Sequence, residues 1–189
     1  MVDPSWLRSG LRATAVTLAG CATVVLAASC DPVSTLPGTM LGTYNVTGTL
    51  GANTCGSGLG APSPWTFTVQ MSEDGTMLYW EPSTGAELSS TMTSSTAVSI
   101  TSTVTANVDA TDAGEGPCDL TEATAIALTF EAATAPAPPS SFTGTITYSF
   151  STNTAVSSTS DCTDQLSASG GSYDTLPCTA TYSISGTLQ

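Results

Sequence analysis

Large apolar residues alternate with threonine and serine over much of this sequence, and this period of two limits the possible folds most strongly. From Tyr44 to Leu50, apolar residues or glycine occupy the even positions and Asn or Thr the odd ones. Trp65–Met71 and Phe142–Phe150 show the same alternation. Because successive side chains of a strand point to opposite faces, each segment predicts a strand with one apolar face and one polar face.

The alternation predicts about eight strands and no helix. Asp74-Gly75 favours the positive backbone dihedrals of a tight hairpin, so Met77–Glu81 is expected to pair antiparallel with Trp65–Met71. A weaker strand is expected over Ala86–Thr93. The remaining strands are expected around Val98–Val108, Ile126–Phe130, Phe142–Phe150 and Ala180–Leu188.

The first predicted strand is repeated near the C-terminus. Thr43–Leu50 reappears as Thr181–Leu188 with five identical residues, including an interior glycine that permits sharp coiling. The first and last strands of a meander must pair if the sheet is to leave no exposed edge. We therefore predict an all-β fold, an antiparallel meander that forms a closed or nearly closed barrel, with a two-sheet β-sandwich as the alternative.

A transmembrane barrel also alternates apolar and polar residues. The segment Thr96–Val108, however, carries Ala and Val rather than large lipid-facing side chains, and aromatic girdles are not evident. The Thr/Ser face is therefore expected to meet water, and the apolar face to pack inward.

The distribution of charge excludes most functions. No Lys, Arg or His follows Arg12, whereas Asp3 is the only one of the 15 carboxylates that precedes it. Nucleophilic hydrolysis normally needs a His or Lys base, and phosphate chemistry needs cations. We therefore predict a protein that is not an enzyme, has no cofactor and does not bind nucleic acid.

The first 30 residues are typical of an export signal, because Arg8 and Arg12 precede an apolar run that ends at Cys30. Residues 26–30 (LAASC) resemble the lipobox of bacterial lipoproteins, and so do residues 18–21 (LAGC). The resemblance implies cleavage before the cysteine and acylation of its side chain. Cleavage at Cys21 would leave an apolar stretch on the mature chain, so Cys30 is the expected lipidation site and Cys21 the alternative.

The lipobox resemblance implies three regions. Residues 1–29 are expected to be the signal peptide, residues 30–42 the lipid anchor and a proline-containing tether, and residues 43–189 a single antiparallel β domain. The expected location is the bacterial cell envelope, outside the cytoplasm, on the periplasmic side or at the cell surface. Cleavage by the ordinary signal peptidase, giving a secreted protein without an anchor, is the alternative.

Loss of Cys21 with the signal and acylation of Cys30 leave four cysteines, an even set in an exported chain. They are expected to form disulfides, for which three pairings are possible. We favour Cys55 with Cys118 and Cys162 with Cys178, because the second bridge would close a polar loop that lacks apolar residues. A zinc site is not expected, since there is no close cysteine pair and no histidine.

Acidic residues gather in two segments of the sequence. Calcium prefers carboxylate oxygens, so the glycine-bearing first segment offers calcium candidates, although neither segment has the EF-hand spacing. The second segment contains Asp161, Asp164 and Asp174. Solvated acidic loops are the favoured interpretation, and no metal is predicted. The calcium candidates are Asp109, Asp112, Glu115 and Asp119.

Two non-catalytic functions agree with these observations. We favour a lipid-anchored, acidic envelope domain that acts as a surface or interaction module and contacts the membrane through its anchor and another envelope protein through its surface. The alternative is a carrier that holds a small apolar ligand inside the barrel, as lipocalins do. The residues that would line the ligand site are Trp65, Phe67, Trp80, Phe142, Tyr148 and Phe150. Packing of the aromatic side chains in a filled core is the favoured interpretation of the same residues.

Overall fold

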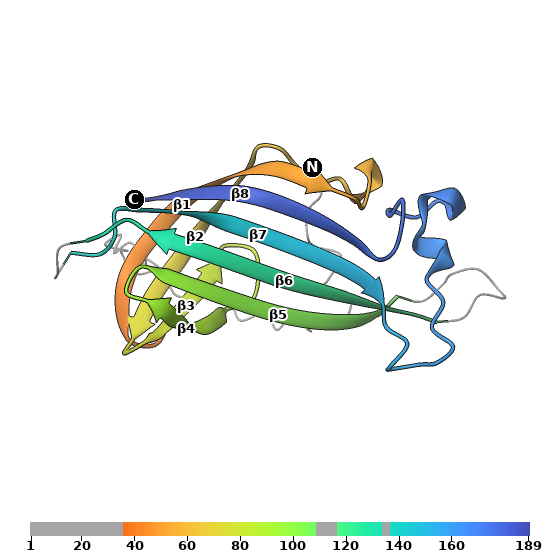
Figure 1. Cartoon of the computed structure of the whole chain (residues 1–189), viewed down its shortest axis with the longest axis horizontal. Coiled ribbons are helices and arrows are strands. Elements are labelled where there is room, and N and C mark those ends of the chain that lie inside the picture. The colour runs from red at the N-terminus through yellow and green to blue at the C-terminus, as the bar shows by residue number, and fades with distance from the viewer. Residues whose placement is uncertain (1–35, 109–116, 134–136) are drawn as a thin grey trace, which may run out of the picture. The chain divides into compact units, whose positions relative to one another are not determined.

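The computed structural model describes residues 36–108, 117–133 and 137–189. They form a closed antiparallel barrel whose eight strands follow one another in sequence order (Figure 1), which confirms the predicted fold. The strands are β1 (Thr39–Asn53), β2 (Trp65–Asp74), β3 (Met77–Pro82), β4 (Leu88–Ser94), β5 (Ala97–Val108), β6 (Cys118–Phe130), β7 (Ser141–Thr152) and β8 (Cys178–Leu188).

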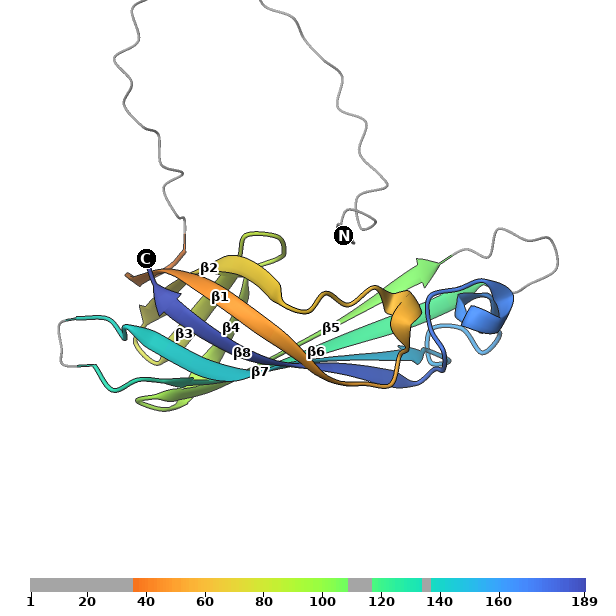
Figure 2. The ribbon, with the colours of Figure 1, turned by 90° about the horizontal axis from the view of Figure 1, so that it is seen from above.

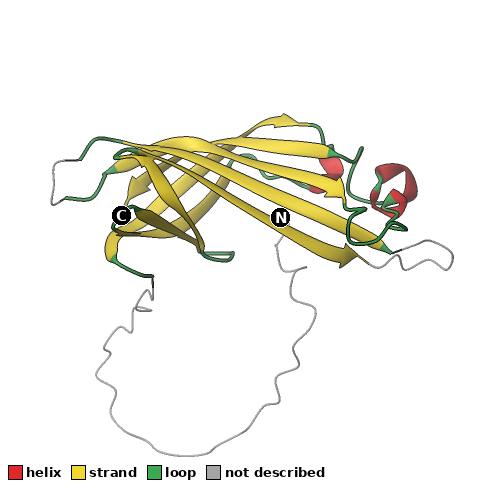
Figure 3. Ribbon diagram, turned by 60° about the horizontal axis from the view of Figure 1, so that its bottom comes forward, coloured by secondary structure: helices red, strands yellow, loops and turns green. Residues whose placement is uncertain are grey.

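The described residues contain only three short 3-10 helices. These are η2 (Ser57–Leu59), η3 (Thr163–Gln165) and η4 (Ser167–Ser169), drawn in red near one end of the strands in Figure 3. A helix with the length and apolarity needed to cross a membrane does not occur in this described part of the chain.

Two strands begin earlier than the alternation predicts. β1 starts at Thr39, which pairs with Glu73 of β2, so Thr39–Gly42 belongs to the barrel although it was expected in the tether. β6 starts at Cys118 rather than near Ile126. Apart from Leu120, small and polar residues fill the first half of β6, so its apolar side is weakly marked in the sequence.

The sequence repeat forms the seam that closes the barrel. β1 and β8 lie antiparallel, with Tyr44 opposite Leu188 and Leu50 opposite Tyr182. The two copies of the repeat are therefore direct neighbours, as the closed meander requires.

A glycine in this seam makes room for an aromatic ring. Gly186 of β8 pairs with Phe142 of β7, and a Cβ atom built at Gly186 would overlap the Phe142 ring. At Gly48, which occupies the same place in the other copy of the repeat, the nearest side-chain atom would lie 3.4 Å away, at ordinary contact distance. Only one of the two glycines is thus required by packing.

We expect G186A to lower the free energy of unfolding by about 1–3 kcal/mol, because the added methyl group displaces a buried ring from a filled core. G48A is the matched control and should change stability much less. Urea denaturation of both variants checks this prediction. Equal losses in the two variants would contradict it.

β5, β6, β7, β8 and β1 continue beyond the ends of β2, β3 and β4 (Figures 1 and 2). The pairs between β1 and β2 end at Gly48 with Trp65, and β4 pairs with β5 only at Ala97 and Val98. Past these points, β5, β6, β7, β8 and β1 remain paired with one another. We call this part the five-strand extension. It comprises residues 49–53, 99–108, 118–127, 145–152 and 178–183.

Two disulfides lie at the far end of the five-strand extension, Cys55–Cys178 and Cys118–Cys162. All four predicted cysteines are bridged, but the predicted pairing is wrong. Closure of the seam sets Asn53 opposite Ala180 and so brings Cys55 to Cys178. The loop after β7 returns beside β6, where the Asp161 amide donates to the Pro117 carbonyl, and so brings Cys162 to Cys118.

The disulfides also bear on location. Such bridges persist in oxidising compartments and are rare in the cytosol. The protein therefore belongs to an oxidising compartment outside the cytoplasm, in agreement with the export signal read from the sequence.

The apolar residues form two clusters. The main core fills the barrel and includes Tyr44, Met71, Leu78, Ile100 and Ile146, each buried. A second core lies at the disulfide end and is built from Cys55, Cys118, Leu120, Phe150, Cys162, Tyr173 and Cys178.

Candidate interaction surface on the five-strand extension

Two of the six aromatic residues predicted to line a ligand site are packed in the main core. Trp80 is 2% exposed and Phe142 is 1% exposed. Their ring centroids lie 5.8 Å apart in an edge-on contact, and Phe130 lies 5.9 Å from Phe142. Edge-on contacts are the geometry that aromatic pairs prefer. Trp80 and Phe142 thus stabilise the barrel through contacts with other side chains of the protein.

Three others are half-buried: Trp65, Phe67 and Tyr148. Trp65 stacks on Phe67 with centroids 4.4 Å apart, and its ring lies 6.3 Å from that of Tyr148. Trp65 is the first residue of β2, and its pair with Gly48 of β1 is the one nearest the five-strand extension. The three rings therefore lie where the extension begins. Rings of this kind retain surface for contact with another molecule.

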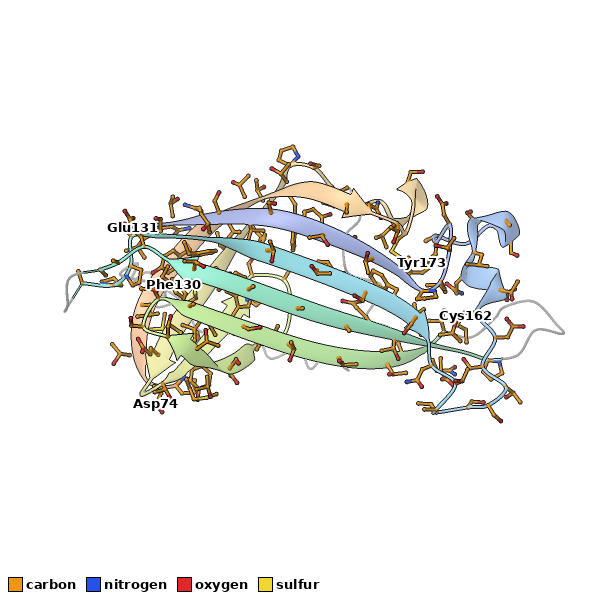
Figure 4. All side chains as sticks on the ribbon, viewed as in Figure 1. Asp74, Phe130, Glu131, Cys162 and Tyr173 are labelled. Carbon is orange, nitrogen blue, oxygen red and sulfur yellow. A yellow bond between two sulfur atoms is a disulfide. The ribbon has the colours of Figure 1, made fainter. Side chains whose placement is uncertain are left out.

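Phe150 belongs to the second core, against which Tyr148 also packs. The Phe150 ring lies 5.2 Å from that of Tyr173, which comes from the loop before β8. Figure 4 shows Tyr173 and Cys162 at the end opposite Asp74 and Glu131. Five of the six predicted residues are thus joined by ring contacts, in the order Tyr148, Trp65, Phe67, Trp80 and Phe142, whereas Phe150 contacts Tyr173 instead.

A row of directly opposed residues crosses the inner face of the five-strand extension: Val104, Glu122, Phe150 and Cys178. Directly opposed residues of antiparallel strands share one face. Phe150 and Cys178 are buried, Glu122 is half-buried and Val104 is 56% exposed. Exposure along this row increases toward β5, so the β5 side of the inner face is accessible to solvent.

Glu122 carries a charge into this apolar row. Burial raises its pKa, and a hydrogen bond from the Thr124 side chain partly offsets that rise. Burial, assisted by the negative charge of Glu122, raises the pKa of Tyr173 to about 12, and the pKa of Tyr148 also rises for these two reasons. Since no Lys, Arg or His follows Arg12, no side chain of the barrel can neutralise Glu122.

We expect E122Q to stabilise the protein at pH 7. Because the pKa of Glu122 is raised by folding, its protonation favours the folded state, and that contribution is lost as pH rises through the folded-state pKa. The stability difference between E122Q and the native sequence should therefore shrink as pH falls toward the unfolded-state pKa. Urea midpoints at neutral and acidic pH measure it.

E131Q is the matched control for this prediction. Hydrogen bonds from Ser140 and Ser141 lower the pKa of the exposed Glu131, so its charged form favours the folded state above the unfolded-state pKa. E131Q should thus lower stability slightly at pH 7. A stability gain of the same size in both variants would contradict the assignment to Glu122.

The acidic calcium candidates are only partly within the structure. Asp109, Asp112 and Glu115 lie outside the described residues. Asp119 is 4% exposed, and its carboxylate accepts a 2.8 Å hydrogen bond from Asn107 Nδ2. Within residues 36–108, 117–133 and 137–189, no three Cys, Asp or Glu side chains are placed to hold a metal ion. The hydrogen bond from Asn107 explains why the Asp119 carboxylate can be buried without a metal ion.

The predicted lipidation sites, Cys30 and Cys21, lie outside the described residues. The described chain starts at Leu36, which is buried, and the Ser72 hydroxyl donates a 2.6 Å hydrogen bond to the Pro37 carbonyl. Lipidation thus stays a prediction, while the residues that lead into β1 are held against β2.

No family model, curated protein or solved structure matches this chain. Sequence reasoning missed Glu122 and Val104 as candidate residues. Glu122 had a signal, because it occupies the same alternate positions as Leu120, Ile126 and Leu128, which predicts a carboxylate on an apolar face.

Proposed function

We propose that the protein is a non-catalytic interaction module of the bacterial cell envelope, anchored through an acylated Cys30. Its contact with an envelope partner lies on the β5 side of the five-strand extension. The observation that carries this proposal is the pair Val104 and Glu122, an exposed aliphatic side chain opposite a half-buried carboxylate. A partner that covers both buries apolar surface and supplies the missing counter-charge.

The remainder of the molecule supports a binding role rather than catalysis. The chain past Arg12 has no cationic or imidazole side chain to act as a base or to bind an anion. The two disulfides and the packed main core give a rigid support for a surface. A rigid support lowers the entropic cost of forming an interface.

Site-specific photo-crosslinking in the producing cells tests this function. Val104 is replaced by p-benzoylphenylalanine, and Val156, which is 65% exposed on a loop, is replaced in a control strain. We expect a single covalent adduct of defined mass from position 104 and none from position 156. Adducts from both positions, or from neither, would argue against a specific contact at the extension.

Anchoring is tested by following acylation and cell fractionation. The native protein and C21A should incorporate a labelled fatty acid and remain in the membrane fraction, whereas C30A should lose the label. Retention of the label in C30A with loss in C21A would move the anchor to Cys21. A protein without label in any form would be secreted rather than anchored.

The carrier of a small apolar ligand remains a second candidate. A closed eight-stranded antiparallel barrel in meander order is the architecture of such carriers, and half-buried Trp65, Phe67 and Tyr148 would contact the ligand. Native mass spectrometry of the protein isolated from its own cells distinguishes the two functions. A reproducible small-molecule adduct that is lost in W65A would favour the carrier.

A further inference from the structure

We infer that residues Thr103–Val108 of β5 form a docking edge for an extended segment of another protein, with a lysine or arginine of that segment reaching Glu122. This inference rests on the proposed function and specifies its surface and the chemistry of the partner. The added segment would become a sixth strand of the five-strand extension, which is a recurrent mode of peptide recognition.

The edge follows from the unequal lengths of β4 and β5. β5 pairs with β6 along its whole length, from Ala97 to Val108, but with β4 only at Ala97 and Val98. Met92 of β4 pairs with Val98, so continuing four residues back to Leu88, where β4 begins, reaches only Ser102. Among the described residues, no strand pairs with the other side of Thr103–Val108, where alternate backbone groups point outward.

This edge lacks the features that normally prevent strand addition. Natural edge strands are protected by charged residues, especially Lys, by Pro, by bulges or by short length. Thr103–Val108 contains Thr, Val, Ala and Asn only, and its register with β6 has no shift. Four of its six residues are exposed, the exceptions being Ala106 and Val108. Four of the six residues are Thr or Val, which are enriched in strands.

Glu122 lies within reach of a cation on the added strand. Neighbouring strands are about 4.8 Å apart, so a residue placed opposite Val104 has its Cβ about 10 Å from that of Glu122, with Val104 between them. The four-carbon stem of lysine can lie across the exposed Val104 and bring its ammonium to the carboxylate. The apolar contact with Val104 and the ion pair with Glu122 together favour a basic residue opposite Val104 on the added strand.

The charge of the chain decides between the possible occupants. A second copy would bring another Glu122 and, beyond Arg12, no cation, so edge-to-edge pairing of two copies would set like charges together. Arg8 and Arg12 lie in the predicted signal peptide. A basic segment of a different protein is therefore the complementary occupant.

The test uses the oxidised protein and a fluorescent hexapeptide, VTVTKT, blocked at both ends. In antiparallel pairing with Thr103–Val108, its lysine and two valines share one face and would lie beside Val104, Ala106 and Val108 of the inner face. Anisotropy gives the dissociation constant, and hydrogen–deuterium exchange locates the contact. We expect slower exchange confined to residues 103–108, and about tenfold weaker binding for VTVTET, whose glutamate faces Glu122.

E122Q is the decisive variant, and E131Q is its matched control at the opposite end of the barrel. E122Q should weaken the binding of VTVTKT by about tenfold while leaving the fold intact, whereas E131Q should bind as the native protein does. A norleucine version of the peptide should bind E122Q and the native protein equally. Weaker binding in a variant that is itself more stable would separate a binding role for Glu122 from a structural one.

Several outcomes would overturn the inference. Exchange protection away from β5, equal peptide affinities in E122Q and E131Q, or dimers of the protein that pair through β5 would each do so. Binding of butylamine at Glu122 as tight as that of the peptide would indicate a small-cation site instead. If any of these results is obtained while position 104 still crosslinks to a partner in cells, only the docking edge is wrong, and the proposed function is still supported.

Discussion

Removal of the Cys55–Cys178 disulfide, in C55A/C178A, is expected to lower the free energy of unfolding by about 5 kcal/mol. The bridge joins residues 123 positions apart, and closing so long a loop removes much conformational freedom from the unfolded chain. It also ties the end of β1 to the start of β8, where the barrel closes. Equilibrium denaturation of the variant without reductant measures the loss.

Two further double variants control this prediction. C118A/C162A removes the bridge between residues 44 positions apart and should lower the free energy of unfolding by about 4 kcal/mol. C55A/C118A breaks both bridges and should leave two free thiols in the folded protein, whereas C55A/C178A should leave none. A thiol count of zero in C55A/C118A would contradict the observed pairing.

W80A is expected to destabilise the protein by about 3–5 kcal/mol, the range for truncation of a buried tryptophan. Trp80 makes edge-on contacts with Phe67 at 6.3 Å and Phe142 at 5.8 Å between centroids, and it joins the half-buried rings to the main core. Thermal and urea unfolding measure the change in stability.

Y79A controls for the loss of an aromatic side chain from the same strand. Tyr79 is half-buried, and its side chain points to the opposite face of β3, so its removal should cost about 1 kcal/mol or less. A small effect of W80A would mean that the barrel interior around Trp80 relaxes easily. That result would favour the apolar carrier over the interaction module.

The alternation of apolar and hydroxyl residues was sufficient to predict the all-β fold and, where the alternation is clear, which residues of a strand point inward. The residues at apolar positions of Tyr44–Leu50 and Phe142–Phe150 do point inward, and the repeat of Thr43–Leu50 predicted the closing seam. This success has a physical reason, since a period of two in burial fixes which residues share a face.

The disulfide pairing was predictable in principle from that same seam. If Thr43–Leu50 pairs antiparallel with Thr181–Leu188, then Cys55 and Cys178 extend beyond matching ends of the two strands. The predicted pair Cys162–Cys178 was based on the polar composition of the loop between these two cysteines, without the pairing of β8 with β1. Long-range register therefore outweighs local loop composition here.

The five-strand extension was not predictable from sequence. Its existence depends on where pairing between β4 and β5 stops, and no residue near Val98 marks that point as a strand end. The exposure of Val104 depends on the same feature. Strand length can be read from a sequence only where turns or breakers limit it, whereas an edge arises from the lengths of neighbouring strands taken together.

The disulfides are nested, because the Cys118–Cys162 bridge lies within the sequence span of Cys55–Cys178. A chain exported from its N-terminus delivers Cys55 and Cys118 to the oxidising compartment first, long before Cys178. Oxidation in order of arrival would join Cys55 to Cys118, and that bond must be exchanged before β8 can take its place beside β1. Correct maturation of this barrel is therefore expected to depend on a thiol–disulfide isomerase rather than on an oxidase alone.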